Sequence, residues 1–85
     1  MKVYAGTYNR KITSDECNVP FSPDSWTDMV NKDKEFIKSV YQGMVPNDVE
    51  IDWQDTSDTI TIGLAVYNRE NLHYADKYII REFEI

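Results

Sequence analysis

Cysteine is nearly absent from this sequence, and so are the features of exported or membrane-inserted proteins. The 85 residues include a single cysteine, Cys17, so no disulfide forms within the chain, and a lone thiol is typical of a reducing compartment. No run of about twenty apolar residues exists, and residues 1–7 lack the apolar core of a signal peptide. We therefore expect a soluble, cytoplasmic protein that does not insert into membranes.

Glycine and proline are also scarce, with three residues of each. Together with an apolar fraction of 41%, this composition is typical of a folded globular chain rather than of a disordered one. A chain of this length has room for one small domain, and no linker, repeat or low-complexity tract divides it. We therefore predict a single domain spanning residues 1–85.

Residues that could form a catalytic site are few. Nucleophilic catalysis by Cys17 would need a base, and the sequence offers one histidine, His73, with no local signature around either residue. The glycines Gly6, Gly43 and Gly63 stand far apart, so no glycine-rich loop is present to cradle a phosphate group. We expect a protein that is not an enzyme and that needs no cofactor.

Basic residues are missing from one segment that is rich in acids. Residues 45–59 contain five carboxylates and no lysine or arginine. The acids are Asp48, Glu50, Asp52, Asp55 and Asp58. An EF-hand calcium loop needs a glycine and a different spacing, and a two-metal nuclease site needs a nearby lysine, so no metal is expected. Glu50 and Asp52 alternate with apolar residues, which predicts that both are exposed and ionised rather than paired for acid–base catalysis.

The first half of the chain predicts a strand followed by a helix. A β-rich run at 2–8 predicts the strand, which ends at the polar residues 9–11. Ser22 followed by Pro23 is typical of a helix start. Apolar residues then recur at spacings of three and four, which predicts an amphipathic helix of about five turns that stops near Gly43.

The second half predicts a sheet. Apolar and polar residues alternate at 49–54 and at 59–67, which predicts two strands joined by a turn. In the second strand one parity holds Ile, Leu and Val, while the other holds small residues that suit crossing by another element or an open face. The last strand, 74–85, has apolar residues of both parities, which predicts burial on both faces or a bulge. The expected fold class is α+β: a small antiparallel sheet of about four strands (order β-α-β-β-β) with one amphipathic helix on one face.

The net charge of -6 disfavours nucleic acid and anionic membranes as direct ligands, because an acidic surface repels phosphates. Alternate strand residues lie about 6.6 Å apart, so the acids of residues 48–58 are predicted to form a regular negative row. Such a row can occupy a basic, nucleic-acid-binding groove of a larger protein in place of phosphates. The predicted partner-binding residues are Asp48, Glu50, Asp52, Asp55, Asp58 and Tyr67.

The sequence thus favours a non-catalytic, protein-binding inhibitor or modulator. Small acidic proteins rich in Asp, Asn, Ile, Tyr and Lys are frequent among phage and mobile-element products that neutralise host defence or nucleic-acid enzymes. By that analogy we expect a nucleic-acid mimic of the anti-defence type.

The aromatic residues leave two alternatives open. Trp26 and Trp53 are expected in the core between helix and sheet, with some of the six tyrosines on the surface. A sheet face bearing tyrosines would bind single-stranded RNA or DNA by stacking. The basic residues expected beside that face are Arg10, Lys11, Arg69 and Arg81. The other alternative is a small assembly subunit or a homodimer joined through a sheet edge.

Overall fold

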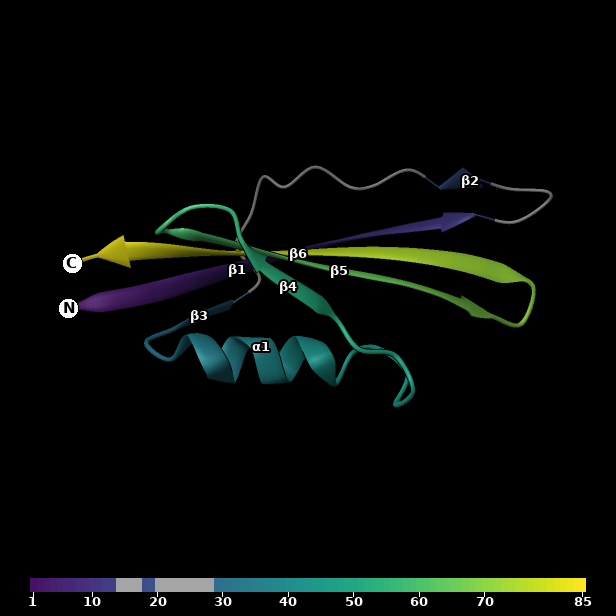
Figure 1. Cartoon of the computed structure of the whole chain (residues 1–85), viewed down its shortest axis with the longest axis horizontal. Helices are drawn as coiled ribbons and strands as arrows, with labels where there is room; N and C mark the ends of the chain where they lie inside the picture. Colours follow the sequence, from purple (N-terminus) through teal and green to yellow (C-terminus); the bar gives the residue numbers. More distant parts are fainter. Residues whose placement is uncertain (14–17, 20–28) are drawn as a thin grey trace.

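The computed structural model describes residues 1–13, 18–19 and 29–85 of the chain. In these residues six strands and one helix follow in the order β1, β2, β3, α1, β4, β5, β6 (Figure 1). The strands are β1 (Lys2–Thr13), β2 (Asn18–Val19), β3 (Met29–Asn31), β4 (Asp52–Asp55), β5 (Ile60–Arg69) and β6 (Leu72–Glu84), and the helix is α1 (Lys34–Gln42). Every strand pair is antiparallel. The fold is therefore broadly α+β, as predicted.

The number and order of the strands differ from the prediction. The sheet runs β2–β1–β6–β5–β4, and β3 pairs with β1 off this path. Since β6 occupies one edge of β1, the short strands β2 and β3 share its other edge. A sheet of about four strands in the order β-α-β-β-β is therefore wrong. Strands of two and three residues are too short to show a period-two pattern, so their existence depends on the edge of β1 that they join.

The first strand is longer than predicted because it pairs with the last one. β1 and β6 are paired from Lys2 opposite Glu84 to Thr13 opposite His73. The polar residues 9–11 therefore continue the strand instead of ending it. This pairing also brings the two chain ends together at one end of the molecule (Figure 1).

The helix begins later than predicted. Residues 29–31 form β3, so a helix through them is wrong, whereas the proposed start at Ser22 lies outside the described residues, as does Trp26. Asp33 caps α1 instead, because its carboxylate accepts a hydrogen bond from the Glu35 backbone N–H (3.0 Å). The predicted stop is confirmed, since α1 ends at Gln42 with Gly43 as its C-cap residue.

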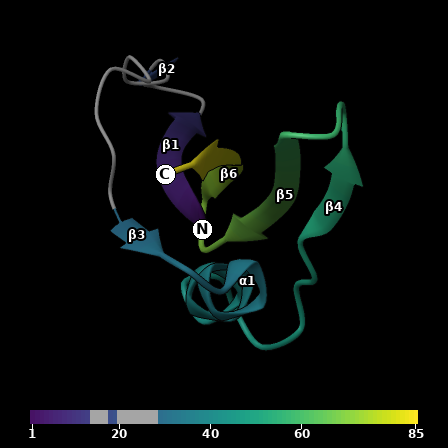
Figure 2. The ribbon, with the colours of Figure 1, turned by 90° about the vertical axis from the view of Figure 1, so that its left-hand side faces the viewer.

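Helix α1 covers one face of the sheet, between β3 and β4 in the end-on view (Figure 2). Ile37 and Tyr41 are its buried residues. A Cβ atom at Gly6 of β1 would lie 2.6 Å from the Tyr41 hydroxyl oxygen, so only a glycine lets the helix approach so closely. A Cβ atom at Gly63 of β5 would lie 2.6 Å from the ring of Trp53, which packs against the core. The small-residue parity of β5 is thus the one that other elements cross.

Strand β6 lies at the centre of the sheet and is buried on both faces. Its consecutive residues Tyr78, Ile79 and Ile80 are all buried although their side chains alternate between the faces. Its register with β1 and β5 is continuous, without a bulge. Of the two explanations predicted for its mixed pattern, burial on both faces is confirmed.

Candidate functional site

The acidic residues lie in the connection from α1 to β4, in β4 itself and in the turn that follows. Gln42, the last residue of α1, holds this connection in place through its side-chain amide. Its Nε2 donates to the Val49 carbonyl (2.7 Å), and its Oε1 accepts from the Ile51 backbone N–H (3.1 Å). Gln42 thus fixes the backbone on both sides of Glu50, at Val49 and at the buried Ile51, and the Glu50 side chain between them is exposed.

Asp48 and Glu50 line a shallow hollow beside the end of α1. Its volume is about 350 Å³, and its other lining residues are Gln42, Asn47 and Val49. The Gln42 amide is already bonded to the backbone, so the two carboxylates are the charged groups of this hollow. A cationic side chain is the ligand that such a polar, negatively charged hollow suits best.

The carboxylates of β4 do not all share one face. Asp52 is exposed, and it lies opposite Leu64 on the side of the sheet away from α1. Asp55 has the other parity and lies opposite Thr61. It accepts hydrogen bonds from the Thr61 hydroxyl (2.6 Å) and from Lys34 Nζ (3.2 Å), and these bonds lower the pKa of Asp55. Asp55 therefore does not continue the regular row of negative charges that the sequence predicts for residues 48–58.

The remaining acids keep their charge unpaired within the described part of the chain. Asp58 is exposed in the turn between β4 and β5. Of the ion pairs among the described residues, only Lys34–Asp55 involves an acid of residues 45–59. Since β4 ends the sheet, these carboxylates line an edge of the molecule. We call Asp48, Glu50, Asp52, Asp55 and Asp58 the acidic edge.

Tyr67 belongs to a different cluster. It lies on the helix-side parity of β5, beyond the residues that pair with β4. Its hydroxyl donates to Asp76 Oδ2 (3.1 Å) and accepts from Arg10 Nη2 (3.0 Å). The structure therefore shows no shared arrangement of Tyr67 with the acidic edge.

The cluster is centred on Asp76, a carboxylate with an exposed fraction of 1%. Arg10 approaches it as a fork, with Nε on Oδ1 (2.8 Å) and Nη2 on Oδ2 (3.1 Å). The Tyr78 hydroxyl donates to the same Oδ2 (2.9 Å), as Tyr67 does. A buried charge is tolerated only when paired and hydrogen-bonded in this way.

Aromatic rings surround this charged pair. The Arg10 guanidinium lies 5.4 Å from the centroid of the Tyr8 ring and 5.3 Å from that of Tyr74, and Tyr74 stacks on Tyr67. The hydrogen bond to Asp76 raises the pKa of Arg10, and burial raises the pKa of Tyr67 and of Tyr78. All three groups therefore keep their protons at neutral pH, and the cluster is suited to holding the strands together.

The role of Asp76 is not predicted from the sequence, and Arg10 is predicted as a base beside a tyrosine face rather than as the partner of Asp76. One signal was present, because Asp76 lies between Tyr74 and Tyr78 on one parity of a strand rich in apolar residues. An acid at such a position needs a cation, but nothing local in the sequence says which one. Arg10 is selected by the pairing of β1 with β6, which places it directly opposite Asp76.

The basic residues expected beside a tyrosine face do not gather on one face. Arg10 neutralises Asp76, and Lys11 points to the opposite side of β1 because adjacent strand residues alternate. Arg81 lies on the same face as Lys11. It pairs with Ala5 of β1, and Ala5 and Lys11 have the same parity on that strand. Arg69 is exposed at the end of β5.

The residues considered for catalysis or metal binding are placed as follows. His73 is exposed, with Nδ1 hydrogen-bonded to Asn68 Oδ1, while Cys17 lies outside the described residues. Residues 1–13, 18–19 and 29–85 contain no group of three or more side chains able to hold a metal ion. The same ranges contain no helix with the length and apolarity required to cross a bilayer.

Comparison with known proteins gives no match among family models, curated proteins or solved structures. The function is therefore inferred from the geometry of the chain's own residues.

Proposed function

We propose that this chain is a non-catalytic protein-binding inhibitor or modulator whose acidic edge enters a basic, nucleic-acid-binding groove of a larger protein. One observation carries the proposal. Four of the five acids, all but Asp55, are exposed carboxylates without an ion pair in the described residues, and no base lies between residues 45 and 59.

The position of the acids supports binding rather than solubility alone. Because they line the last strand of the sheet and its flanking turns, the acids form an outer rim of the sheet that a groove can contact. Like-signed charges close together reinforce one another's potential, and complementary potentials speed association with an oppositely charged partner. The hollow beside Asp48 and Glu50 adds a place for one lysine or arginine of the partner.

Such an edge substitutes for the phosphates of a nucleic acid, so the protein acts as a nucleic-acid mimic. This is the mode expected of an anti-defence protein from a phage or mobile element, and the lone cysteine fits action in the cytoplasm. Tyr67 is not part of the proposed contact, because its hydroxyl is engaged with Asp76 and Arg10.

Affinity capture from the native cell with matched charge variants tests the proposal. One bait reverses three acids of the edge in Asp48→Lys/Glu50→Lys/Asp58→Lys. The control reverses three exposed acids elsewhere in Glu35→Lys/Glu70→Lys/Glu84→Lys, so both baits undergo the same change in net charge. The wild type and the control should retain a basic nucleic-acid-binding protein, and the edge variant should lose it.

Two results would contradict the proposal. The first is equal retention of the same protein by the edge variant, with circular dichroism showing all baits folded. The second is retention that does not weaken as salt rises, since contacts between exposed charges are screened.

Binding of single-stranded nucleic acid has less support, because the charge of Arg10 is used within the protein. Titration with a fluorescent single-stranded RNA or DNA at low salt distinguishes the two functions. The acidic edge predicts essentially no binding, whereas a stacking surface predicts micromolar or tighter binding.

A further inference from the structure

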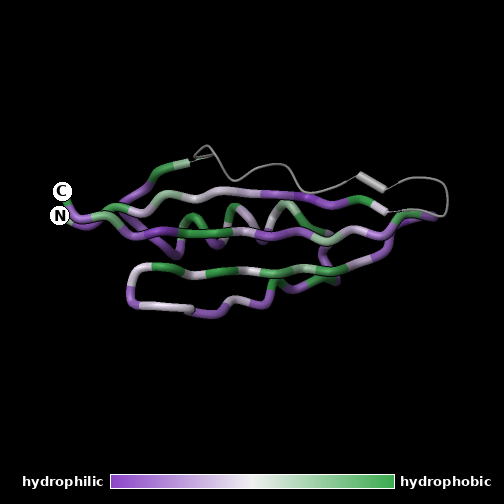
Figure 3. The backbone as a smooth tube through the Cα atoms, turned by 90° about the horizontal axis from the view of Figure 1, so that it is seen from above, coloured by the Kyte–Doolittle hydropathy of each residue, from purple (hydrophilic) through white to green (hydrophobic). Residues whose placement is uncertain are grey.

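The face of the sheet opposite α1 exposes branched aliphatic residues. On β5 the aliphatic residues of this face are Ile60 and Ile62, which are half-buried, and Leu64 and Val66, which are exposed; we call these four the outer stripe. Leu64 is 51% exposed and Val66 is 77% exposed. Seen from this side, β5 is a hydrophobic strand next to the more polar β4 (Figure 3). Aliphatic residues gathered on one exposed face are typical of a surface that another molecule covers.

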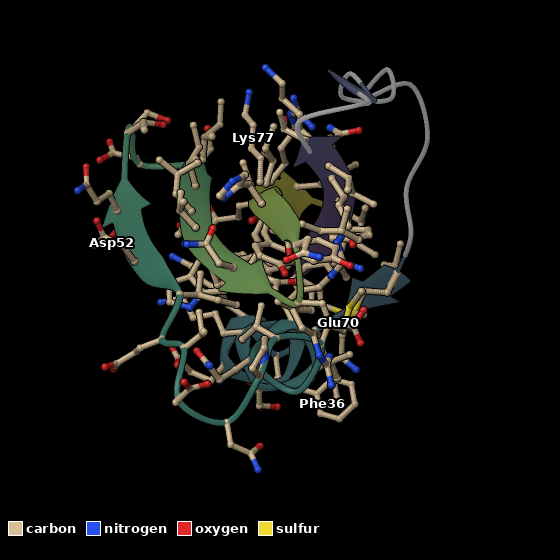
Figure 4. All side chains as sticks on the ribbon, turned by 90° about the vertical axis from the view of Figure 1, so that its right-hand side faces the viewer. Phe36, Asp52, Glu70 and Lys77 are labelled. Atoms are coloured by element: carbon tan, nitrogen blue, oxygen red, sulfur yellow. The ribbon has the colours of Figure 1, made fainter. Side chains whose placement is uncertain are left out.

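Opposite charges flank the outer stripe, and the register of the sheet places them. Leu64 lies directly between Asp52 of β4 and Lys77 of β6. Figure 4 shows Lys77 on the side of the sheet away from Phe36 of α1, with Asp52 on the edge strand β4. One flank of the stripe is therefore acidic and the other is basic.

This arrangement is complementary to itself. A rotation of 180° about an axis that runs along β5, within the contact plane, lays β5 of one copy on β5 of a second copy. The same rotation lays β4 over β6 of the second copy, so Asp52 meets Lys77 of the other chain twice. A rotation about an axis perpendicular to the strands would instead place β6 over β6 and bring Lys77 near Lys77, which like-charge repulsion disfavours.

We propose that the outer stripe is the interface of a homodimer in which two sheets pack face to face, with Asp52 and Lys77 pairing between the chains. The interface goes beyond the proposed function, because it uses a face of the sheet rather than its edge. Only Asp52 belongs to both surfaces. The other four acids of the acidic edge lie outside the paired positions, so a dimer still presents them to a partner.

The small size of the outer stripe indicates a weak dimer. Residues 60–66 of β5 and the two strands beside it span roughly 20 by 15 Å, or at most about 300 Å² per copy, because Ile79 of β6 within this area is already buried. This is below the about 800 Å² per partner of a standard stable interface. We therefore expect a concentration-dependent dimer with a dissociation constant in roughly the micromolar range.

Sedimentation velocity of the purified full chain, from about 1 to 500 µM, measures this equilibrium directly. The Leu64→Asp substitution should raise the dissociation constant at least about tenfold, because it brings two carboxylates together in the centre of the interface. The matched control is Phe36→Asp, which removes an equally exposed apolar side chain from α1 on the opposite side of the molecule. It should leave the dissociation constant unchanged.

A charge swap provides the sharper test. Either Asp52→Lys or Lys77→Glu alone should weaken the dimer by about fivefold, since each replaces two attractions by two repulsions. The double variant should return to within about twofold of the wild type, a recovery that a merely structural role of either residue would not produce. The triple variant Asp48→Lys/Glu50→Lys/Asp58→Lys should still dimerise, so failure of the dimer and failure of the partner proposal are distinguishable.

Three outcomes would overturn the dimer. One is a monomer across the whole concentration range. Another is a dimer that Leu64→Asp leaves intact, or one that the charge swap fails to restore. The last is a wild-type chain that stays monomeric but retains a different protein in affinity capture, with that retention lost in Leu64→Asp and kept in Phe36→Asp. This result would assign the outer stripe to that protein instead.

Discussion

The two faces of β5 invert the usual distribution of polar and apolar residues. The face under α1 carries Gly63 and Ala65 on β5 and a buried carboxylate, Asp76, on β6. The opposite face carries the outer stripe, of which Leu64 and Val66 are more than half exposed. From the hydropathy of β5 alone, the aliphatic face would be expected to be buried and the small-residue face exposed.

Space and hydrogen bonding decide which face of β5 is buried. A helix and the Trp53 ring approach the sheet closely only where glycine leaves room for them. Asp76 tolerates the same environment because Arg10, Tyr67 and Tyr78 supply its hydrogen bonds. Bulky side chains on the small-residue parity would hold the covering layer away.

The largest loss of stability is expected when the buried Asp76 carboxylate is removed from the covered face. The Asp76→Ala variant leaves Arg10 and the hydroxyls of Tyr67 and Tyr78 without their acceptor. The free energy of unfolding should fall by about 3–5 kcal/mol, measured by urea denaturation with circular dichroism. The exposed control Asp58→Ala should change it by less than about 0.5 kcal/mol.

A double variant separates lost charge from lost packing at this site. Arg10→Met/Asp76→Leu removes both charges together, so it should be clearly more stable than Asp76→Ala. If Asp76→Ala costs no more than Asp58→Ala, the Asp76 cluster does not hold the covered face together.

A smaller effect is expected at the contact between β5 and Trp53. Gly63→Val places side-chain atoms where the Trp53 ring and the Ile51 side chain already lie. The free energy of unfolding should fall by about 2–3 kcal/mol through overpacking. On the opposite face of the same strand, Val66→Thr should cost less than about 0.5 kcal/mol at concentrations where the chain is monomeric. Equal losses from the two substitutions would remove the contrast between the faces.

The most gradual effect is a loss of stability in alkaline solution. Burial, and then the nearby Asp76 carboxylate, raise the pKa of Tyr67 and Tyr78 above that of an unfolded tyrosine. Between about pH 10 and the raised values, the unfolded chain releases these protons while the folded chain keeps them. The stability is thus complete below pH about 10 and is lost as pH rises, by at most about 1.4 kcal/mol per tyrosine for each pH unit.

Urea denaturation at several pH values between about 9 and 11.5 checks this expectation, with tyrosinate absorbance reporting ionisation directly. Tyr78→Phe removes one of the two groups, so its stability should fall less steeply over this range. An identical slope for the wild type and Tyr78→Phe would show that Tyr78 does not contribute.

Local features could be predicted from the sequence where the signal is itself local. The end of α1 at Gly43 follows from a glycine after an amphipathic run, and the exposure of Glu50 and Asp52 follows from strict alternation. The burial of β6 on both faces follows from apolar residues of both parities. The start of α1 was placed too early because the apolar residues before Asp33 imitate a helical spacing.

The periodicities can be read from the sequence: which residues of β5 share a face, which acids alternate outward, and where the helix stops. Tertiary contacts select which parity of β5 is covered, bring Arg10 to Asp76, and turn Asp55 to Lys34 instead of extending the acidic row. Periodicity depends on neighbours a few residues apart along the chain. The choice between two faces depends on the space left by partners such as α1 and Trp53, and on strands that pair from opposite ends of the sequence.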